Sequence, residues 1–450
     1  MLHAGFLLKR GKRSRSNAPR LQTVAVDLTP IFPGGENGGA KVFTLELLHR
    51  LAELAPQTQF VLLTQEASHQ ELAPLDSANM RRITVLDRRG HAALWTLDMF
   101  SHVLVHLPRA LGRTAGKLGY SMLTLAKRSG SRSLLNDLNV DLLFCPFTAT
   151  TYSEPLIPIV SVIHDLQHSA YPEFFAMRDV VHRTLIFTQA ARRSTILVAN
   201  SEYTRDAAII EARRNPDDIK TVPLQISQNR LDTAPRDEAI LDRLQLVAGK
   251  YLIYPANFWK HKNHEMLLTA FGLARHSGLA DDIRLVCTGA PSQRQRWLVH
   301  AARRLALEDR ILFPGYLGDA EFLATVANSA GLIYPSLHEG FGLPVVEALA
   351  AGVPVACSNV TSLPEVAGDA AILFDPRIPE DIAQAMITMT QDKELISRLV
   401  QAGKQRAARF SDSRKMAEQY WEIFQQAVGR EVRSGRRWRV SAGESREIHQ

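Results

Sequence analysis

The chain has 450 residues, of which 46% are hydrophobic and 22% charged, a globular composition that excludes a globally disordered or collagen-like protein. Three isolated cysteines without a Cys-x-x-Cys pair exclude a disulfide framework and favour a reducing compartment. The net charge of +7 is concentrated at the two ends, because residues 1–20 carry six basic side chains and no acidic one, and residues 430–450 carry six arginines and three glutamates. We therefore expect anionic partners at these basic tails rather than over the whole surface.

Short β-rich runs alternate with helical patterns through the first half of the chain. The strand-like runs are 21–28, 58–64, 81–87, 141–147, 158–166, 194–200 and 220–224. Helical patterns are expected at 41–54, at 173–193 and after Ser201, a candidate N-cap. This alternation predicts a parallel sheet covered by helices on both faces.

The same rhythm returns in the second half. Strand-like runs are expected at 250–257, 283–290, 310–317, 330–336, 353–358 and 371–375, with helical patterns at 263–276, 292–306, 319–328 and 342–351 and from 380 to 428. We therefore predict an α/β protein with two Rossmann-like, doubly wound domains facing each other across a cleft, which is the expected site. The predicted order is a basic disordered tail (1–20), an N-terminal domain (21–225), a linker (226–249), a C-terminal domain (250–410), a helix crossing back to the N-terminal domain (411–429) and a basic tail (430–450).

The most specific motif is HEGFGLPVVEALAAGVPV, which begins at residue 338. Glu339 and Glu347 lie eight residues apart and flank Gly340–Phe341–Gly342, between a strand end and a helix start. Backbone amides at such a helix N-terminus suit a phosphate or a sugar hydroxyl, and a carboxylate inside the helix suits two ribose hydroxyls. An isolated pair of glutamates is most often a surface pair around an ordinary turn, but the surrounding glycines and Pro344 favour the binding interpretation.

This segment resembles the retaining, nucleotide-sugar-dependent glycosyltransferases of the GT-B fold, group-1 type (glycosyltransferase family 4-like), whose hallmark is two glutamates separated by seven residues. The resemblance covers about residues 22–428. It implies that Glu339 contacts the donor sugar, that Glu347 contacts the ribose, and that the backbone of Gly340, Phe341 and Gly342 holds sugar hydroxyls and the diphosphate. It also implies that the N-terminal domain receives the acceptor and that the C-terminal domain binds the nucleotide-sugar donor.

Two motifs of the first half extend the resemblance. The sequence PGGENGGAKVF is not a G-x-G-x-x-G fingerprint, and alone it would most often be an ordinary turn. The resemblance implies that its Gly38–Gly39 pair closes over the donor diphosphate and the acceptor. It also implies that His164, at the end of a predicted strand, lies near the donor sugar while Asp165 positions the loop; without that context His164 would be read as a structural residue.

The segment YPANFWKHKNHEMLL departs from the family pattern. The resemblance implies an arginine and a lysine that neutralise the diphosphate leaving group, and Lys262 matches the lysine. The arginine position falls on Ala256 or Asn257, neither of which is charged. We expect Lys260 or His261 to compensate, or the amide of Asn257 to bind a phosphate oxygen.

Other chemistries lack their motifs. The chain has no Asp-x-Asp pair and no H-E-x-x-H, and His102 and His106 with Asp98 lie in apolar and basic surroundings, so we expect neither a metal nor another cofactor. A nucleic-acid partner is not expected either, because no recognition module accompanies the basic tails.

Residues 91–136 form the candidate membrane-docking segment. They combine apolar stretches, Trp95 and Phe100 with six basic side chains and no acidic one after Asp98, a pattern typical of a helix lying in an anionic lipid surface. A core helix pair with a solvated basic face is the alternative. No apolar run reaches the roughly 18 residues of a spanning helix. The expected location is therefore cytoplasmic, with peripheral attachment to the inner face of the cell membrane.

The resemblance implies a metal-independent hexosyltransferase of cell-envelope polysaccharide biosynthesis. By the same resemblance it would transfer the sugar, with a slight preference for mannose, from a nucleoside diphosphate sugar to a lipid-linked or polysaccharide acceptor, with retention of configuration. Lys262, Glu339 and His164 are the predicted catalytic residues. The alternatives are a catalytically weak sugar-nucleotide-binding protein, which the missing arginine keeps open, and a synthase or phosphorylase acting on a soluble sugar.

Overall fold

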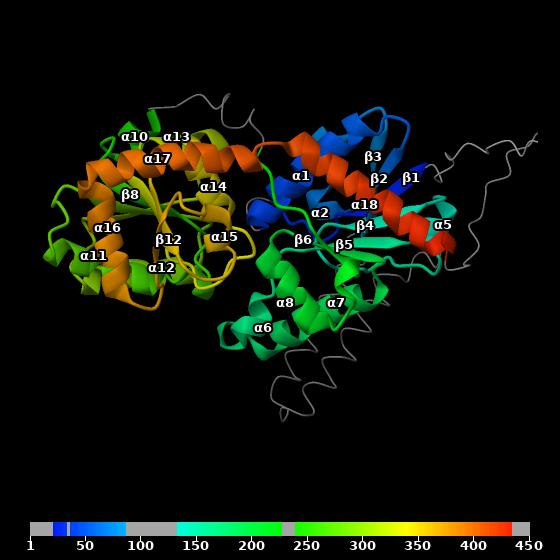
Figure 1. Cartoon of the computed structure of the whole chain (residues 1–450), viewed down its shortest axis with the longest axis horizontal. Helices are drawn as coiled ribbons and strands as arrows, with labels where there is room; N and C mark the ends of the chain where they lie inside the picture. Colours follow the sequence, from blue (N-terminus) through cyan, green and yellow to red (C-terminus); the bar gives the residue numbers. More distant parts are fainter. Residues whose placement is uncertain (1–20, 34–36, 87–132, 227–238, 434–450) are drawn as a thin grey trace, which may run out of the picture.

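The structure is a computed structural model that describes residues 21–33, 37–86, 133–226 and 239–433. Two parallel sheets stand side by side in Figure 1, one in each half of the chain. The first has the order β3 (Met80–Leu86), β2 (Gln59–Gln65), β1 (Thr23–Asp27), β4 (Leu142–Cys145), β5 (Ile159–Ile163), β6 (Ile196–Ala199) and β7 (Ile219–Thr221). The second has the order β10 (Ile311–Gly315), β9 (Arg284–Thr288), β8 (Tyr251–Pro255), β11 (Gly331–Tyr334), β12 (Val355–Ser358) and β13 (Ile372–Phe374). The predicted α/β architecture with two doubly wound sheets is confirmed.

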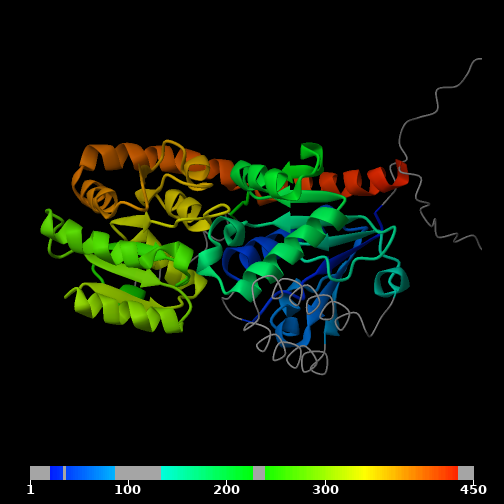
Figure 2. The ribbon, with the colours of Figure 1, turned by 90° about the horizontal axis from the view of Figure 1, so that it is seen from below.

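Helices cover both sheets (Figures 1 and 2). Those of the N-terminal half are α1 (Gly38–Leu54), α2 (Glu66–His69), η1 (Ala73–Leu75), α5 (Leu134–Asp137), α6 (Gln167–Ala170), η2 (Pro172–Phe174), α7 (Met177–Arg193), α8 (Glu202–Ala212) and η3 (Pro216–Asp218). Those of the C-terminal half are α10 (Ala239–Leu244), η4 (Lys260–Lys262), α11 (His264–His276), α12 (Gln293–Arg304), α13 (Asp319–Ala327), α14 (Leu343–Ala350), α15 (Leu363–Ala367), α16 (Pro379–Gln391), α17 (Lys393–Ala407), η5 (Ala408–Phe410) and α18 (Ser413–Arg433).

The strands form where the sequence has short, almost uninterrupted apolar runs. Every residue of β5, β6 and β8 is buried, as expected for parallel strands covered on both faces. The adjacent strands β1 and β2 pair in parallel from Thr23 with Gln59 to Asp27 with Leu63. Parallel pairing brings the carboxyl ends of neighbouring strands to one edge of each sheet, where the loops of the candidate site begin.

The last helix of the described part of the chain returns to the first domain. The helix α18 lies along α1 and over β5, and Figure 1 shows it across the N-terminal sheet while α17 remains on the other domain. Tyr420 packs against Phe43 and Phe144 with ring centroids 5.9 and 5.7 Å apart. The core of the N-terminal domain therefore includes side chains from the end of the chain.

The two crossings between the domains lie beside each other. The amide of Ile226, at the end of the first domain, donates to the carbonyl of Phe410 at 2.8 Å. The amide of Asp412, just before α18, donates to the side-chain carbonyl of Gln225 at 3.1 Å. The chain thus passes between the domains twice at one place.

Two segments differ from the expected boundaries. Residues 239–244, expected within the linker, form α10, whose Ile240 and Leu241 are buried because they join the core of the second domain. Arg430, expected in the basic tail, is part of α18 and donates to Asp218. The tails 1–20 and 434–450, residues 227–238 and residues 91–132 of the candidate membrane-docking segment lie outside the described residues.

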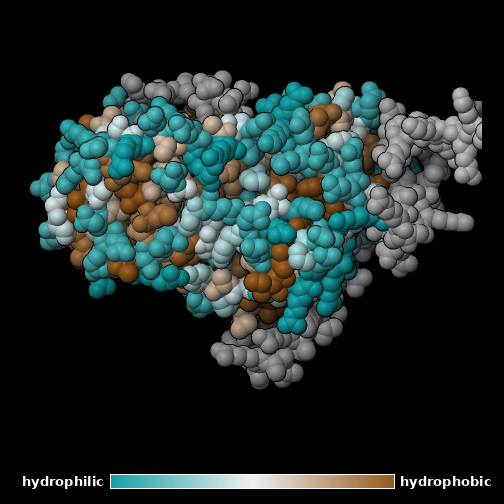
Figure 3. All heavy atoms as spheres, viewed as in Figure 1, coloured by the Kyte–Doolittle hydropathy of each residue, from teal (hydrophilic) through white to brown (hydrophobic). Residues whose placement is uncertain are grey.

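No helix within the described ranges has both the length and the apolar character needed to cross a membrane. The face in Figure 3 is largely hydrophilic, with hydrophobic residues in smaller groups over both domains.

Candidate functional site

An ion pair lies at the carboxyl edge of the second sheet. Lys262 ends η4, which follows β8, and Glu339 lies in the loop after β11. The ammonium Nζ of Lys262 is 2.6 Å from Oε1 of Glu339 and 3.4 Å from the hydroxyl of Tyr334, and the two charged side chains are only 12% and 11% exposed. An ammonium has three N–H donors, so one is left without a partner among the described residues. This N–H is available to an anionic ligand.

The loop 339–342 is held by hydroxyl groups of its own domain. The hydroxyl of Ser362 donates to the carbonyls of Glu339 and Phe341 at 3.0 and 3.2 Å, and the amide of Glu339 donates to the hydroxyl of Thr361 at 3.2 Å. Gly342 ends the loop with φ of 98°, a left-handed conformation that favours glycine, and α14 begins at the next residue. These bonds fix the backbone of the loop.

Gly340 lies directly against the first domain. A Cβ atom at Gly340 would stand 1.6 Å from the carbonyl oxygen of His164, so only glycine permits this approach. The carbonyl of Gly340 accepts hydrogen bonds from the hydroxyls of Ser201 at 2.6 Å and Thr204 at 3.1 Å. Ser201 is also the N-cap of α8, as predicted, because its hydroxyl accepts from the amide of Thr204.

His164 is held in one tautomer beside this contact. Its Nε2 lies 2.7 Å from the carbonyl of Pro146, so Nε2 must carry the hydrogen and donate it. The ring packs against Phe43 and Phe147, and burial lowers the pKa of His164, so the imidazole is neutral near pH 7. The bare Nδ1 can therefore accept a hydrogen bond, for example from a sugar hydroxyl.

The N-termini of two helices meet at the same junction. The helix α1 begins at Gly38, which has φ of 50°, and a Cβ atom at Gly39 would lie 3.0 Å from Cδ1 of Leu343, the first residue of α14. Each N-terminus carries partial positive charge. The structure thus brings the predicted residues Gly38 and Gly39 next to the loop 339–342.

Glu347 lies in the interior of α14. It is only 5% exposed, and Leu343, Val345, Val346, Ala348 and Leu349 of the same helix are buried as well. Burial, followed by the charges of Glu339 and Glu347, raises the pKa of Tyr334 far above its ordinary value. The two motif glutamates and Tyr334 therefore share one electrostatic environment.

No cation replaces the missing arginine at its own position. The side-chain carbonyl of Asn257 accepts from the amide of Ala290 at 2.8 Å, which fixes the orientation of the Asn257 amide. His261 is buried, and burial together with Lys262 lowers its pKa to about 2. His261 is thus neutral, and the expectation that it replaces the missing arginine as a cation is wrong. The other candidate for this role, Lys260, is exposed.

Sequence reasoning missed a second set of contacts between the domains. The carboxylate of Glu365, in α15, accepts hydrogen bonds from the amides of Glu202 and Tyr203, the first two residues of α8, at 2.9 and 3.1 Å. Arg377 donates to the hydroxyl of Tyr171 at 3.0 Å. For Glu365 the available signal was a carboxylate in the segment TSLPEV, which is separated from the end of the motif by five residues.

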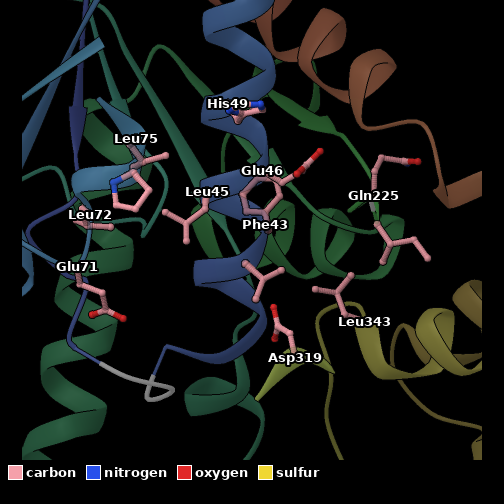
Figure 4. A pocket seen from close by; sticks show the side chains of 13 residues that line it. Phe43, Leu45, Glu46, His49, Glu71, Leu72, Leu75, Gln225, Asp319 and Leu343 are labelled. Atoms are coloured by element: carbon pink, nitrogen blue, oxygen red, sulfur yellow. The ribbon is translucent and has the colours of Figure 1, made fainter. Parts of the chain in front are cut away.

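A pocket of about 400 Å³ opens on another side of the junction. Its lining includes Phe43, Glu46 and His49 along α1 and Leu343 and Asp319 of the second domain, and Figure 4 shows Leu343 and Asp319 near the lower end of α1 in that view. Its lining includes neither Lys262 nor Glu339, so it is separate from the ion pair. It adjoins the site through Leu343 and through Phe43, which packs against His164.

Among the residues that the structure describes, no three His, Cys, Asp or Glu side chains form a group that could hold a metal ion.

Comparison with known proteins agrees with this geometry. Residues 240–406 match the family model for glycosyl transferases group 1. Over 257 residues the chain is 29% identical to the O-antigen chain mannosyltransferase B of Escherichia coli, covering 56% of this chain and 66% of the relative. It is 30% identical over 181 residues to the serotype-specific mannosyltransferase WbdA of E. coli, covering 40% of this chain and 22% of that protein. The matches thus span less than two thirds of these curated relatives.

A solved structure extends the comparison to the whole fold. The crystal structure of HepE from Anabaena in complex with UDP and glucose superposes with a TM-score of 0.66 and 17% identity, covering 90% of this chain and all of HepE. With the two parallel sheets, this likeness confirms the predicted GT-B fold. The chain therefore has the GT-B fold, and residues 240–406 within its C-terminal half match the model of the glycosyl transferases group 1.

Proposed function

We propose that the protein is a retaining glycosyltransferase that transfers a hexose, with mannose favoured, from a nucleoside diphosphate sugar to a glycan or lipid-linked acceptor. The observation that carries the proposal is the buried Lys262–Glu339 pair, in which Glu339 begins the loop 339–342 that leads into α14. A buried ammonium beside a glycine-containing loop at a helix N-terminus suits a diphosphate. The preference for mannose is supported by the two E. coli relatives, both named mannosyltransferases.

In this proposal the second domain stabilises the leaving group. Negative charge develops on the departing diphosphate in the transition state, and Lys262 and the backbone amides of the loop 340–342 would stabilise it. Lys262 would exchange part of its contact with Glu339 for a phosphate oxygen. Glu339 is then free to accept hydrogen bonds from the donor sugar, while Glu347 binds the ribose and the fixed amide of Asn257 donates to a phosphate oxygen.

The first domain orients the reacting sugar. Nδ1 of the neutral His164 accepts a hydrogen bond from a sugar hydroxyl, and Gly38 and Gly39 allow the backbone to approach the diphosphate. The acceptor hydroxyl attacks from the same face as the departing phosphate, and that phosphate receives its proton. No protein nucleophile is needed for this step.

The test is a transfer assay with the full chain. GDP-mannose, UDP-glucose and ADP-glucose are each offered with glycan and lipid-linked acceptor fractions, with and without EDTA. We expect turnover of one donor, strongest for GDP-mannose, that EDTA does not abolish, and NMR of the product should show the anomeric configuration of the donor. Nucleotide binding without transfer or hydrolysis of any donor would contradict the proposal and support a sugar-nucleotide-binding protein.

A further inference from the structure

The short helix α15 touches the donor loop at one end and the first domain at the other. Ser362, directly before α15, donates to the carbonyls of Glu339 and Phe341. Three residues later, the carboxylate of Glu365 accepts from the first two amides of α8. One turn of helix thus links the loop that carries Glu339 to the opposite domain.

The helix α15 is fixed within its own domain. The guanidinium of Arg406, in α17, donates to the carbonyl of Val366 at 2.9 Å and also to the carbonyl of Glu365. Leu363 and Val366 are fully buried. Because α15 is held by α17 and by the core, it cannot shift independently of the second domain. The hydrogen bonds of Glu365 therefore connect α8 to the second domain as a whole.

The helix α8 contacts the donor loop a second time. Its N-cap Ser201 and its residue Thr204 donate hydroxyl hydrogens to the carbonyl of Gly340. The same turn of α8 therefore receives the carboxylate of Glu365 through its amides and holds Gly340 through its hydroxyls. A carboxylate that accepts from two amides at a helix N-terminus makes charge-assisted bonds, which are stronger than bonds between neutral groups.

We infer that Glu365 is a positioning residue that locks the first turn of α8 onto the second domain and so holds the loop 339–342 in its donor-binding conformation. The lock acts through two linked sets of contacts, Glu365 with the α8 amides and Gly340 with the α8 hydroxyls. It favours the state in which both domains contribute to the site. The inference deepens the proposed function and rests on it only for its kinetic consequence.

The structural consequence is measured first, without any substrate. Spin labels are placed on Ile210→Cys in α8, where the native side chain is 74% exposed, and on Arg303→Cys on the exposed face of α12. The native cysteines Cys145, Cys287 and Cys357 are buried, so the labels go to the introduced positions. We expect one narrow distance distribution for the parent and a broader one with a longer component for Glu365→Ala. An unchanged distribution in Glu365→Ala would overturn the inference.

Matched variants separate the lock from a general loss of charge. Glu394→Ala removes an exposed carboxylate from the first turn of α17 in the same domain and should keep the parent distribution. Glu365→Gln keeps the size of the side chain but loses its charge and one acceptor, and it should resemble Glu365→Ala. Glu365→Asp keeps the charge on a shorter side chain and should restore part of the narrow distribution. Equal distributions for Glu365→Ala and Glu394→Ala would refute the lock.

The kinetic consequence distinguishes positioning from simple stability. If the lock sets the fraction of protein competent to bind donor, Glu365→Ala raises KM for the donor about tenfold and leaves kcat within about twofold. A purely structural role would lower kcat through loss of folded protein and leave KM unchanged, and that result would contradict the inference. If no donor is turned over, the proposed function fails, while the distance measurement still decides the lock.

Discussion

The two domains present different chemistry to the junction between them. Among the described residues, the second domain contributes the charged groups Lys262, Glu339 and Glu347, all largely or fully buried. Directly against the loop 339–342 the first domain contributes the neutral His164, serine and threonine hydroxyls, and glycine backbone, although the charges of its Asp165 and Arg183 also act on histidines of the second domain. Recognition of a charged ligand should therefore depend on the second domain, whereas the first domain should act through shape and neutral hydrogen bonds.

Loss of the cation should have the largest effect. Lys262→Ala removes the ammonium that stabilises the leaving group and leaves Glu339 buried without its partner. We expect kcat of the proposed reaction to fall by a factor of about 100 to 1,000. Lys393→Ala, which removes an exposed lysine at the start of α17 in the same domain, should change kcat less than about twofold. Equal losses in both variants would show that charge in general, rather than the buried pair, matters.

Loss of the helix carboxylate should weaken binding of the nucleotide. Glu347→Gln keeps the buried volume but removes the charge, and we expect the free energy of donor binding to weaken by about 1.5–3 kcal/mol, measured by calorimetric titration. Glu347→Ala should in addition lower the melting temperature, because the side chain is buried. Glu308→Gln, at an exposed position of the same domain, serves as the control. An unchanged affinity in Glu347→Gln would remove Glu347 from the nucleotide site.

The contact between the loop 339–342 and the first domain can be tested by adding one methyl group. Gly340→Ala would place Cβ against the carbonyl of His164, so the loop and the first domain must separate, at a cost of about 1–3 kcal/mol in donor affinity. Gly429→Ala in α18 meets no atom within 4 Å and should stabilise the protein by about 0.5–1 kcal/mol. Donor binding by Gly340→Ala as tight as that of the parent would mean that the approach of the two domains is not needed.

A buried histidine of the second domain should make stability depend on pH. His264 lies between the rings of Tyr254 and Phe258 with neither ring nitrogen bonded, and burial lowers its pKa to about 3. The unfolded chain, with a histidine pKa near 6.5, binds the proton first, so stability is full above about pH 6.5 and falls as the pH drops towards 3. We expect a loss of about 1 kcal/mol from this residue between pH 6.5 and 5.5.

The measurement is urea unfolding at both pH values. His264→Phe should remove that part of the pH dependence, because phenylalanine fills the aromatic site without a titrating group. His300→Phe, at an exposed position of α12, should leave the dependence unchanged. The same pH slope in His264→Phe and in the parent would contradict the assignment.

The sequence predicted the fold better than the site. Buried parallel strands require continuous apolar runs, so β5 and β8 could be located from residues 158–166 and 250–257 alone. The residues Lys262 and Glu339 were identified, but their direct pairing was not, because it depends on the path of two separate loops. Glu365 was missed because its partners are backbone amides 163 and 162 residues away, which leave no pattern in the sequence. The burial of Glu347 was missed because a carboxylate in an apolar helix can face either side.

The return of α18 to the first domain has a consequence for synthesis of the chain. On the ribosome, residues 21–226 emerge long before Tyr420, yet the apolar surface of α1 and β4 around Phe43 and Phe144 is covered by that last helix. This apolar surface of the nascent first domain therefore stays uncovered by α18 until the whole second domain has been synthesised. A stop codon before residue 413 removes the cover permanently, so C-terminal truncation damages the domain that was synthesised first.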